Sequence, residues 1–344
     1  MGKMRVCYMC MIILFIFNWV VGCTNNNERY NKVDDIKIGI TVYKEDDKFI
    51  STIITNILEL AKAKEEEDNV KIKIDILDAK GSLSNQCNQV DKFVLNDYDV
   101  ICVNIVDRTS AATIIDKAKN NNIPIVFFNR EPVEEDMKRW DEIYYVGAEA
   151  EKSGELQGRL IIDEYSSNKS EVDKNGDGKI QYVMLEGENG HQDTAIRTEY
   201  SIKTVVQSGI EVEKLADDTA NWEFSEAKSK MTDWIKEFGD EIEVVFSNND
   251  DMALGAISAL RECNIYDVIV VGVDGVIEAL QAIKSGEMLG TVISNSIAQA
   301  EGIFNIAYLK ATNGDLSNIE GLKGKYIKTK HIKVDKENVD LYLK

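Results

Sequence analysis

Short runs of β-branched and apolar residues alternate along the chain with longer segments whose apolar residues recur at helical spacing. Because crossover helices join parallel strands, this alternation predicts an α/β fold with helices on both faces of parallel sheets. The expected strands are Lys37–Val42, Val70–Ile76, Asp99–Val103, Ile123–Phe127, Ile180–Leu185, Glu243–Phe246 and Asp267–Val273. The expected helices include Phe49–Lys64, Ala111–Lys119, Ser153–Tyr165, Thr194–Gln207, Glu223–Phe238 and Met252–Cys263.

Polar side chains follow nearly every expected strand. Ligands of open α/β sheets bind beyond the carboxyl ends of the strands, where several loops converge. Any single member of the set could instead be only a helix N-cap, but the recurrence in both halves of the chain indicates a polar cleft. The residues are Asp46, Asp47, Asn104, Asn129, His191, Asp193, Asn248 to Asp251, and Asp274.

The first residues carry an export signal in front of this body. Lys3 and Arg5 precede an apolar run over 7–21 that is short for a membrane span, so residues 1–22 are expected to be a signal peptide. Val20-Val21-Gly22-Cys23 resembles a bacterial lipobox, which predicts acylation of Cys23 and a tether over 23–35. An uncleaved anchor or an ordinary signal peptide is the alternative.

Charge and cysteine content narrow the function classes. The formal net charge of −20 argues against a nucleic-acid-binding protein, which needs a basic face. Outside the signal region the cysteines are Cys87, Cys102 and Cys263, whose spacing fits neither a disulfide framework nor a metal knuckle. Cys102 lies in an apolar run and is expected to be a buried thiol.

The segment from Asp173 to Gln181 has the spacing of a calcium-binding loop. Oxygen-bearing side chains occupy its first, third, fifth and ninth positions, and Gly178 stands at the sixth, where such a loop turns sharply. The twelfth position, a bidentate Glu in an EF-hand, is Met184, so the last ligand must come from elsewhere. The alternative is a polar surface turn without metal.

The residues of the expected cleft suit a neutral polyhydroxylated ligand. Carboxylates accept hydrogen bonds, amides accept and donate, and a guanidinium offers a planar fork of donors. Asp193 and Arg197 stand four residues apart on an expected helix, so the carboxylate can hold the guanidinium. Phe49 and Trp222 could pack on the apolar faces of a pyranose, although either could also belong to the core.

Eight motifs along the chain resemble those of the galactose/glucose-binding proteins of sugar ABC transporters, in the type I periplasmic-binding-protein superfamily. The resemblance covers the chain from Ile36 onward. The motifs are IGITVYKEDDKF (38–49), VNIVD (103–107), VFFNREP (126–132), DKNGDGKIQ (173–181), GHQDTAIR (190–197), TANWEFSEAK (219–228), IEVVFSNNDDMALGA (242–256) and VGVD (271–274).

The resemblance implies a set of sugar-contacting residues and a calcium site. The implied sugar contacts are Asp47, Phe49, Asn104, His191, Asp193, Arg197, Trp222, Asn249 and Asp274. At one further position the family has Asn where this chain has Ser294, followed by Asn295, and a hydroxyl replaces the two donors and one acceptor of an amide there. The implied Ca²⁺ ligands are Asp173, Asn175, Asp177, the Lys179 carbonyl, Gln181 and Glu243, which supplies the carboxylate missing at Met184.

The family architecture implies two Rossmann-like lobes with parallel sheets, joined by a three-stranded hinge. The N-terminal lobe is expected to take 36–147 plus 294–325, and the C-terminal lobe 148–293 plus 326–344. The implied function is an extracytoplasmic, lipid-anchored, monomeric protein that closes on D-galactose or D-glucose and presents it to an ABC transporter permease.

The sequence argues against two rival functions, an enzyme and a DNA-binding repressor, so no catalytic activity is expected, and it leaves two other functions open. A glycosidase would also place paired carboxylates beside a sugar, but a cleft sized for one free hexose has no room for an aglycone. A sugar-responsive repressor would need a basic helix-turn-helix where this chain has its export signal. A sensor presenting sugar to a chemoreceptor or kinase, or a binding protein for another monosaccharide, would use the same site.

Overall fold

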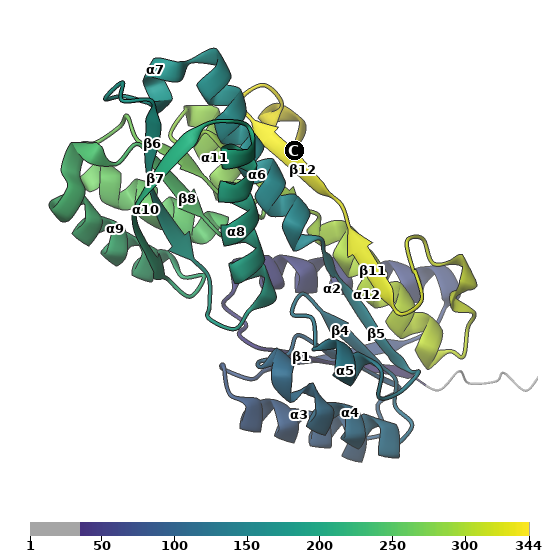
Figure 1. Ribbon diagram of the computed structural model, residues 1–344. Coiled ribbons are helices and arrows are strands. Elements are labelled where there is room, and N and C mark those ends of the chain that lie inside the picture. Colours follow the sequence, from purple (N-terminus) through teal and green to yellow (C-terminus); the bar gives the residue numbers. More distant parts are fainter. Residues whose placement is uncertain (1–34, 344) are drawn as a thin grey trace, which may run out of the picture. The chain divides into compact units, whose positions relative to one another are not determined.

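The computed structural model describes residues 35–343, and its core consists of two six-stranded sheets (Figure 1). In the first sheet the strand order is β11-β5-β4-β3-β1-β2, and every strand pair is parallel. We call this sheet and its helices the first lobe. Its strands are β1 (Ile36–Val42), β2 (Ile72–Asp78), β3 (Val100–Val103), β4 (Ile125–Phe128), β5 (Ile143–Ala148) and β11 (Tyr326–Thr329). Its helices are α2 (Lys48–Asp68), α3 (Leu83–Leu95), α4 (Ala111–Asn120), α5 (Glu134–Met137) and α12 (Ser296–Ala311).

The second sheet has the order β12-β10-β9-β8-β6-β7, and β12 alone runs antiparallel to its neighbour. With its helices it forms the second lobe. Its strands are β6 (Lys179–Glu186), β7 (Glu211–Thr219), β8 (Val244–Ser247), β9 (Ile269–Val271), β10 (Gly290–Ser294) and β12 (His331–Asp335). Its helices are α6 (Ala150–Ser167), α7 (Lys169–Val172), α8 (Gln192–Gln207), α9 (Phe224–Phe238), α10 (Asp250–Glu262) and α11 (Ile277–Ser285). Short 3₁₀ turns lie at Arg108–Ser110, Gly239–Glu241, Leu316–Asn318 and Val339–Leu341.

The chain passes between the lobes three times: after β5, after β10 and after β11. The last crossing differs from the expected boundary at 325/326, because β11 pairs with β5 in the first sheet and the chain crosses at Lys330. Ser294 likewise closes β10 of the second sheet and does not open the first-lobe segment. The two lobes of parallel strands agree with the expected fold class.

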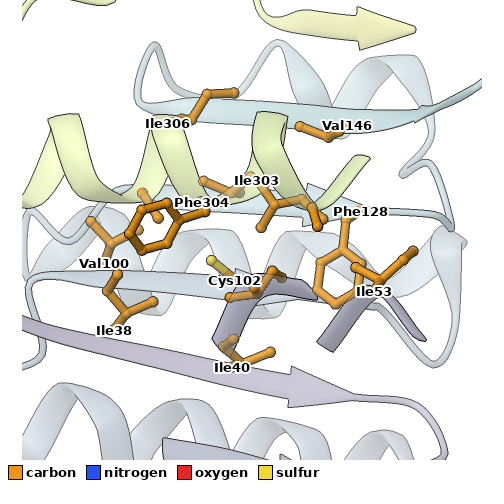
Figure 2. Packing of buried hydrophobic residues seen from close by; sticks show 14 of the residues in the cluster. Ile38, Ile40, Ile53, Val100, Cys102, Phe128, Val146, Ile303, Phe304 and Ile306 are labelled. Atoms are coloured by element: carbon orange, nitrogen blue, oxygen red, sulfur yellow. The ribbon is translucent and has the colours of Figure 1, made fainter. Parts of the chain in front are cut away.

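Alternate residues of the central strands supply separate cores on the two faces of each sheet. On one face of the first sheet, Figure 2 shows Ile303 and Phe304 of α12 against Val100 and Cys102. Ile101 and Val103 of β3 pack on α3 and α4 at the opposite face. Since both faces are covered, the strands are apolar at successive positions and do not alternate with polar residues. Burial raises the pKa of the Cys102 thiol to about 12, in keeping with the expected buried thiol.

The sequence pattern does not predict several elements, among them β7 and α12. The edge strand β7 carries charged residues at most positions and is only partly buried, so it has no apolar run. Helix α12 has the opposite character, because it packs against the first sheet and against α2 and is apolar around most of its circumference. An apolar segment of this kind has little helical periodicity to detect.

The packing of α12 predicts a large difference between two isoleucines of the same helix. Ile303 is fully buried, whereas Ile297 is 59 % exposed. Ile303→Ala is expected to lower the free energy of unfolding by about 2–5 kcal/mol, because it removes buried methylene groups and leaves a cavity. Ile297→Ala should change it by no more than about 0.5 kcal/mol. Urea denaturation of both variants checks this, and equal effects would contradict the assigned packing.

Candidate functional site

Loops at the carboxyl ends of strands in both lobes enclose a cavity of about 320 Å³, part of it open to solvent. The lining combines three carboxylates, two guanidiniums, an imidazole, two amides and three aromatic rings. Its residues are Tyr43, Asp47, Phe49, Asn129, Arg130, His191, Asp193, Arg197, Trp222, Asn249 and Asp274. Eight of these residues are among the predicted sugar contacts.

Three of the lining side chains are also helix N-caps. One Asp47 carboxylate oxygen accepts from a backbone N–H of α2 at 2.9 Å, and the Asn249 oxygen accepts from one of α10 at 3.0 Å. At the start of α8, His191 Nδ1 accepts from the Asp193 N–H at 3.1 Å. Cap and lining residue are therefore not alternatives here, because one side chain serves both roles. The caps fix these side chains in direction before any ligand arrives.

His191 is held in one neutral tautomer. Burial lowers the pKa of its imidazole well below the usual value, and the nearby Arg130 and Arg197 guanidiniums lower it further. Since Nδ1 accepts a hydrogen bond from the backbone, the proton of the neutral ring resides on Nε2. His191 thus offers a fixed donor at the cavity.

Arg197 lies at the centre of a buried charge cluster. Its guanidinium donates to Asp193 Oδ2 at 2.9 Å and to the Asn248 carbonyl at 2.8 Å, and it lies 3.7 Å from Asp274 Oδ1. Burial raises the pKa values of Asp193 and Asp274, while the Arg197 charge opposes the rise. The cluster contains two carboxylates for one guanidinium, so it retains hydrogen-bond acceptor capacity for a ligand.

The backbone at Asp274 adopts an uncommon conformation, and Asp250 holds it there. Asp274 has φ 127°, a region that L-residues rarely occupy. Asp250 is fully buried and accepts from the N–H groups of Gly275 at 2.6 Å and Val276 at 3.1 Å, and from Thr291 Oγ1 at 2.6 Å. Burial raises its pKa to about 6. Asp250 therefore fixes the loop that carries Asp274.

Two aromatic rings from different lobes line the same cavity. Phe49 lies in the first turn of α2 in the first lobe, and Trp222 lies between β7 and α9 of the second. The Trp222 backbone has φ 68°, and its ring meets the His191 ring edge-on at a centroid distance of 5.1 Å. Gly187 allows this placement, because a Cβ there would lie 2.1 Å from the Trp222 ring.

Sequence reasoning did not select three of the lining residues as ligand contacts. Tyr43 donates from its hydroxyl to Asp47 Oδ2 at 2.5 Å, and Arg130 lies over the Tyr43 ring at 3.6 Å from its centroid. Asn129 had been noted as a polar strand-end residue, and this signal could have selected it. Tyr43 and Arg130 stand beside such positions, within the motifs at 38–49 and 126–132.

Two of the predicted contacts lie outside the lining. Asn104 is fully buried behind it, where its amide donates to the Phe128 carbonyl and to Asn129 Oδ1, both at 3.2 Å. Ser294 is also buried, and its N–H donates to the Asp274 carbonyl at 3.0 Å. The Ser294 hydroxyl has no hydrogen-bond partner within 35–343. Both residues support lining residues directly.

Comparison with known proteins decides the family. The profile of the periplasmic binding protein domain matches residues 38–315. The chain belongs to this family. D-galactose/methyl-galactoside binding periplasmic protein MglB of Haemophilus influenzae is 38 % identical over 315 residues, covering 90 % of this chain and 92 % of the relative. A putative rhizopine-binding protein of Rhizobium meliloti is 32 % identical, covering 81 % of this chain and 85 % of the relative.

Solved structures share the architecture of this periplasmic binding protein. An ABC transporter solute binding protein from Bacillus halodurans with bound myo-inositol has a TM-score of 0.74 and 28 % identity, covering 90 % of this chain and 97 % of that one. A periplasmic solute binding protein from Actinobacillus succinogenes with bound D-allose has a TM-score of 0.76 at 20 % identity, covering 90 % and 100 %, and shows the fold alone. The family is one of transport-associated binding proteins, which agrees with the expectation of no catalytic activity.

The predicted calcium loop of this binding protein lies against Glu243, far along the chain. The buried Glu243 carboxylate accepts from the backbone N–H groups of Lys174 at 2.6 Å and Gln181 at 2.9 Å. Asp173 Oδ1 is buried and has no hydrogen-bond partner among the described residues, as an oxygen reserved for a cation would be. Asn175 and Gln181 donate amide N–H groups inside the loop. A 180° rotation of each side-chain amide would direct its oxygen to a cation in the loop instead.

The donor chemistry of this loop fits a hard cation, but its carboxylates are not gathered around one point. Among residues 35–343, no three His, Cys, Asp or Glu side chains lie close enough together to hold a metal. Two amides and the Lys179 carbonyl would have to complete the site with Asp173, Asp177 and Glu243. Calcium therefore stays a prediction.

The predicted signal peptide, Cys23 and most of the predicted tether lie outside the described residues. No helix within 35–343 is long and apolar enough to cross a membrane. The predicted acylation of Cys23 thus stays a prediction as well.

The close approach of Gly187 to Trp222 generates a test of the site geometry. In Gly187→Ala the new methyl group must displace the indole, so we expect a changed intrinsic fluorescence spectrum and a loss of about 1–3 kcal/mol in stability. The same substitution in a Trp222→Phe background is the control, and there the spectral change should disappear. A spectral change that persists in this background would mean that Gly187 does not position Trp222.

Proposed function

We propose that this binding protein encloses one D-galactose or D-glucose between its lobes and delivers it to the permease of an ABC transporter. The observation that carries the proposal is the cavity lining, in which charged acceptors, fixed donors and two aromatic rings from different lobes surround one small space. The 38 % identity to a D-galactose/methyl-galactoside binding protein supports the choice of sugar.

The charge balance of the lining favours a neutral ligand rich in hydroxyl groups. Three carboxylates face two guanidiniums, so an anionic ligand would add to an existing excess of negative charge. Sugar hydroxyls can donate to Asp193 and Asp274 and accept from Arg197. His191 Nε2–H supplies one further donor from the same lobe.

The placement of the aromatic rings supports a mechanism of hinge closure. Phe49 belongs to the first lobe and Trp222 to the second, so a pyranose contacts both only when the lobes are together. In the open form the sugar enters and meets one lobe. In the closed form both lobes contact it, and the transporter recognises this form.

Ser294 bears on whether the ligand is a hexose or a related cyclic polyol. Its hydroxyl stands where the resembled family has an amide and has no hydrogen-bond partner within 35–343, whereas its backbone N–H donates to the Asp274 carbonyl. The structure with myo-inositol, at 28 % identity, belongs to a protein of the same fold. A sensor that presents the same ligand to a chemoreceptor or kinase would use the same closure.

A calorimetric screen of about ten monosaccharides and polyols against ligand-stripped protein tests the proposal. Binding of D-galactose or D-glucose with a dissociation constant near micromolar, about −8 kcal/mol, is expected for an enclosed hexose. Trp222→Ala should weaken binding by about 2–3 kcal/mol through lost burial and stacking. Trp234→Phe, in the core of the second lobe, is the control. Heat with a pentose or polyol but with neither hexose would refute the assigned sugar.

We also infer that Ca²⁺ occupies the loop at 173–181 and that Cys23 carries a lipid anchor. The loop spacing, the adjacent Glu243 and the unpartnered Asp173 oxygen support the cation. The lipobox at 20–23 supports the anchor. The cation would tie the loop before β6 to the residue before β8, and so clamp the outer end of the second sheet.

Chelation tests the calcium site. Removing Ca²⁺ should lower the melting temperature, because a cation bound only by the folded state stabilises it, by about 2.7 kcal/mol at a hundredfold excess over its dissociation constant. Glu243→Gln should melt at a temperature that no longer depends on Ca²⁺, whereas Glu213→Gln on the neighbouring strand should keep the dependence. Identical melting of the wild type with and without chelator, together with no calcium by elemental analysis, would exclude the site.

A further inference from the structure

Three ion pairs join the two lobes within residues 35–343, and all have the same polarity. In each pair the first lobe supplies the cation and the second lobe the carboxylate. Arg130 Nη2 lies 2.5 Å from Glu188 Oε2, Lys44 Nζ lies 2.9 Å from Glu223 Oε1, and Lys48 pairs with Asp251. We call these the interlobe pairs. A common polarity makes the facing edges of the lobes attract one another.

Arg130 is the buried member of the interlobe pairs. Its side chain is 5 % exposed, against 34 % for Lys44 and 45 % for Lys48. Glu188 is 37 % exposed, so this pair is desolvated on the arginine side only. Pairs between two exposed charges contribute little, whereas the loss of Glu188 would leave a poorly solvated guanidinium. The pair of Arg130 with Glu188 is therefore the one with the largest expected effect on closure.

The first lobe prepares Arg130 for this contact. Its guanidinium lies over the Tyr43 ring at 3.6 Å from the centroid, and Nη1 donates to the Val106 carbonyl at 3.0 Å. The Tyr43 hydroxyl in turn donates to Asp47. These contacts all come from one lobe, so they hold the guanidinium whether or not the lobes meet. Nη2 is left to contact Glu188.

The interlobe pairs lie on two sides of the ligand cavity. Arg130 and His191 line both this cavity and an adjoining one that Glu188 also lines. Lys48, Glu223 and Asp251 line a different adjoining space, which shares Phe49 and Trp222 with the ligand cavity. Each of these two adjoining spaces is thus bordered by residues of an interlobe pair.

We propose that Arg130 is a closure residue: its ion pair with Glu188 holds the lobes together over the bound monosaccharide and slows its release. The two lysine pairs add a weaker, salt-sensitive attraction at the other side. This inference rests on the proposed function, because it assumes that the lobes close on a ligand.

The test changes the carboxylate and leaves the Arg130 stack intact. Glu188→Gln is compared with Glu262→Gln, which neutralises the partner of Lys228 in a pair that lies wholly in the second lobe. D-galactose and D-glucose are the probes, and stopped-flow fluorescence measures the release rate at 20 mM and 500 mM salt. We expect Glu188→Gln to release sugar about five- to tenfold faster than the wild type at low salt. Its release rate should also depend less on salt, while Glu262→Gln follows the wild type. Equal rates and equal salt dependence in all three proteins would overturn the proposal.

A second measurement separates this proposal from the choice of sugar. Small-angle X-ray scattering of the ligand-free proteins compares the wild type with Glu188→Lys and Glu262→Lys at low salt. Glu188→Lys places two cations together across the lobes, so its radius of gyration should be larger than those of the other two proteins. If neither sugar binds the wild type, this comparison still tests whether the Arg130–Glu188 pair holds the lobes together. Equal radii in all three proteins would then overturn the closure role.

Discussion

Two buried carboxylates converge on the Arg197 guanidinium, and the part of the site that the second lobe supplies depends on this charge cluster. Burying Asp193 and Asp274 side by side without a cation would force one of them to take up a proton. Arg197 offsets that cost, and the Asn248 carbonyl holds it in place at 2.8 Å. Because one cation cannot satisfy two carboxylates, acceptor capacity remains. Hydroxyl groups of a ligand can use it without bringing further charge into the cavity.

The remaining side chains of the site are fixed by the starts of helices and by strained backbone within each lobe. Asp47, His191 and Asn249 each cap a helix, and Asp250 holds the loop of Asp274 through backbone N–H groups. Contacts between the lobes are fewer, and they include the Gln192 amide, which donates to the Asn129 carbonyl at 3.0 Å. This division describes two prepared half-sites, each rigid internally, that meet over a ligand.

The alternation of strands and helices predicted the parallel architecture. Polar side chains after apolar runs marked the cleft and several of its lining residues, and the family resemblance implied eight lining residues as sugar contacts. Sequence reasoning did not select Tyr43 or Arg130, since their roles come from a ring and a guanidinium that meet across two loops. The resemblance implies Asn104 as a contact, and it follows β3, but it lies behind Asn129 and hydrogen-bonds to it. The crossing after β11 was misplaced because a short strand shows no sign of which sheet it joins. The place of Asn104 and the crossing after β11 are both set by partners that are distant in the sequence.

The central claim is that side chains of both lobes surround one monosaccharide in the Arg197 cavity. A crystal structure of the protein grown with D-galactose tests it most directly. The account predicts one hexose between Phe49 and Trp222, with hydroxyl groups within hydrogen-bond distance of Asp193, Arg197 and Asp274. A sugar bound outside this cavity, or one that contacts a single lobe in an otherwise closed protein, would contradict it.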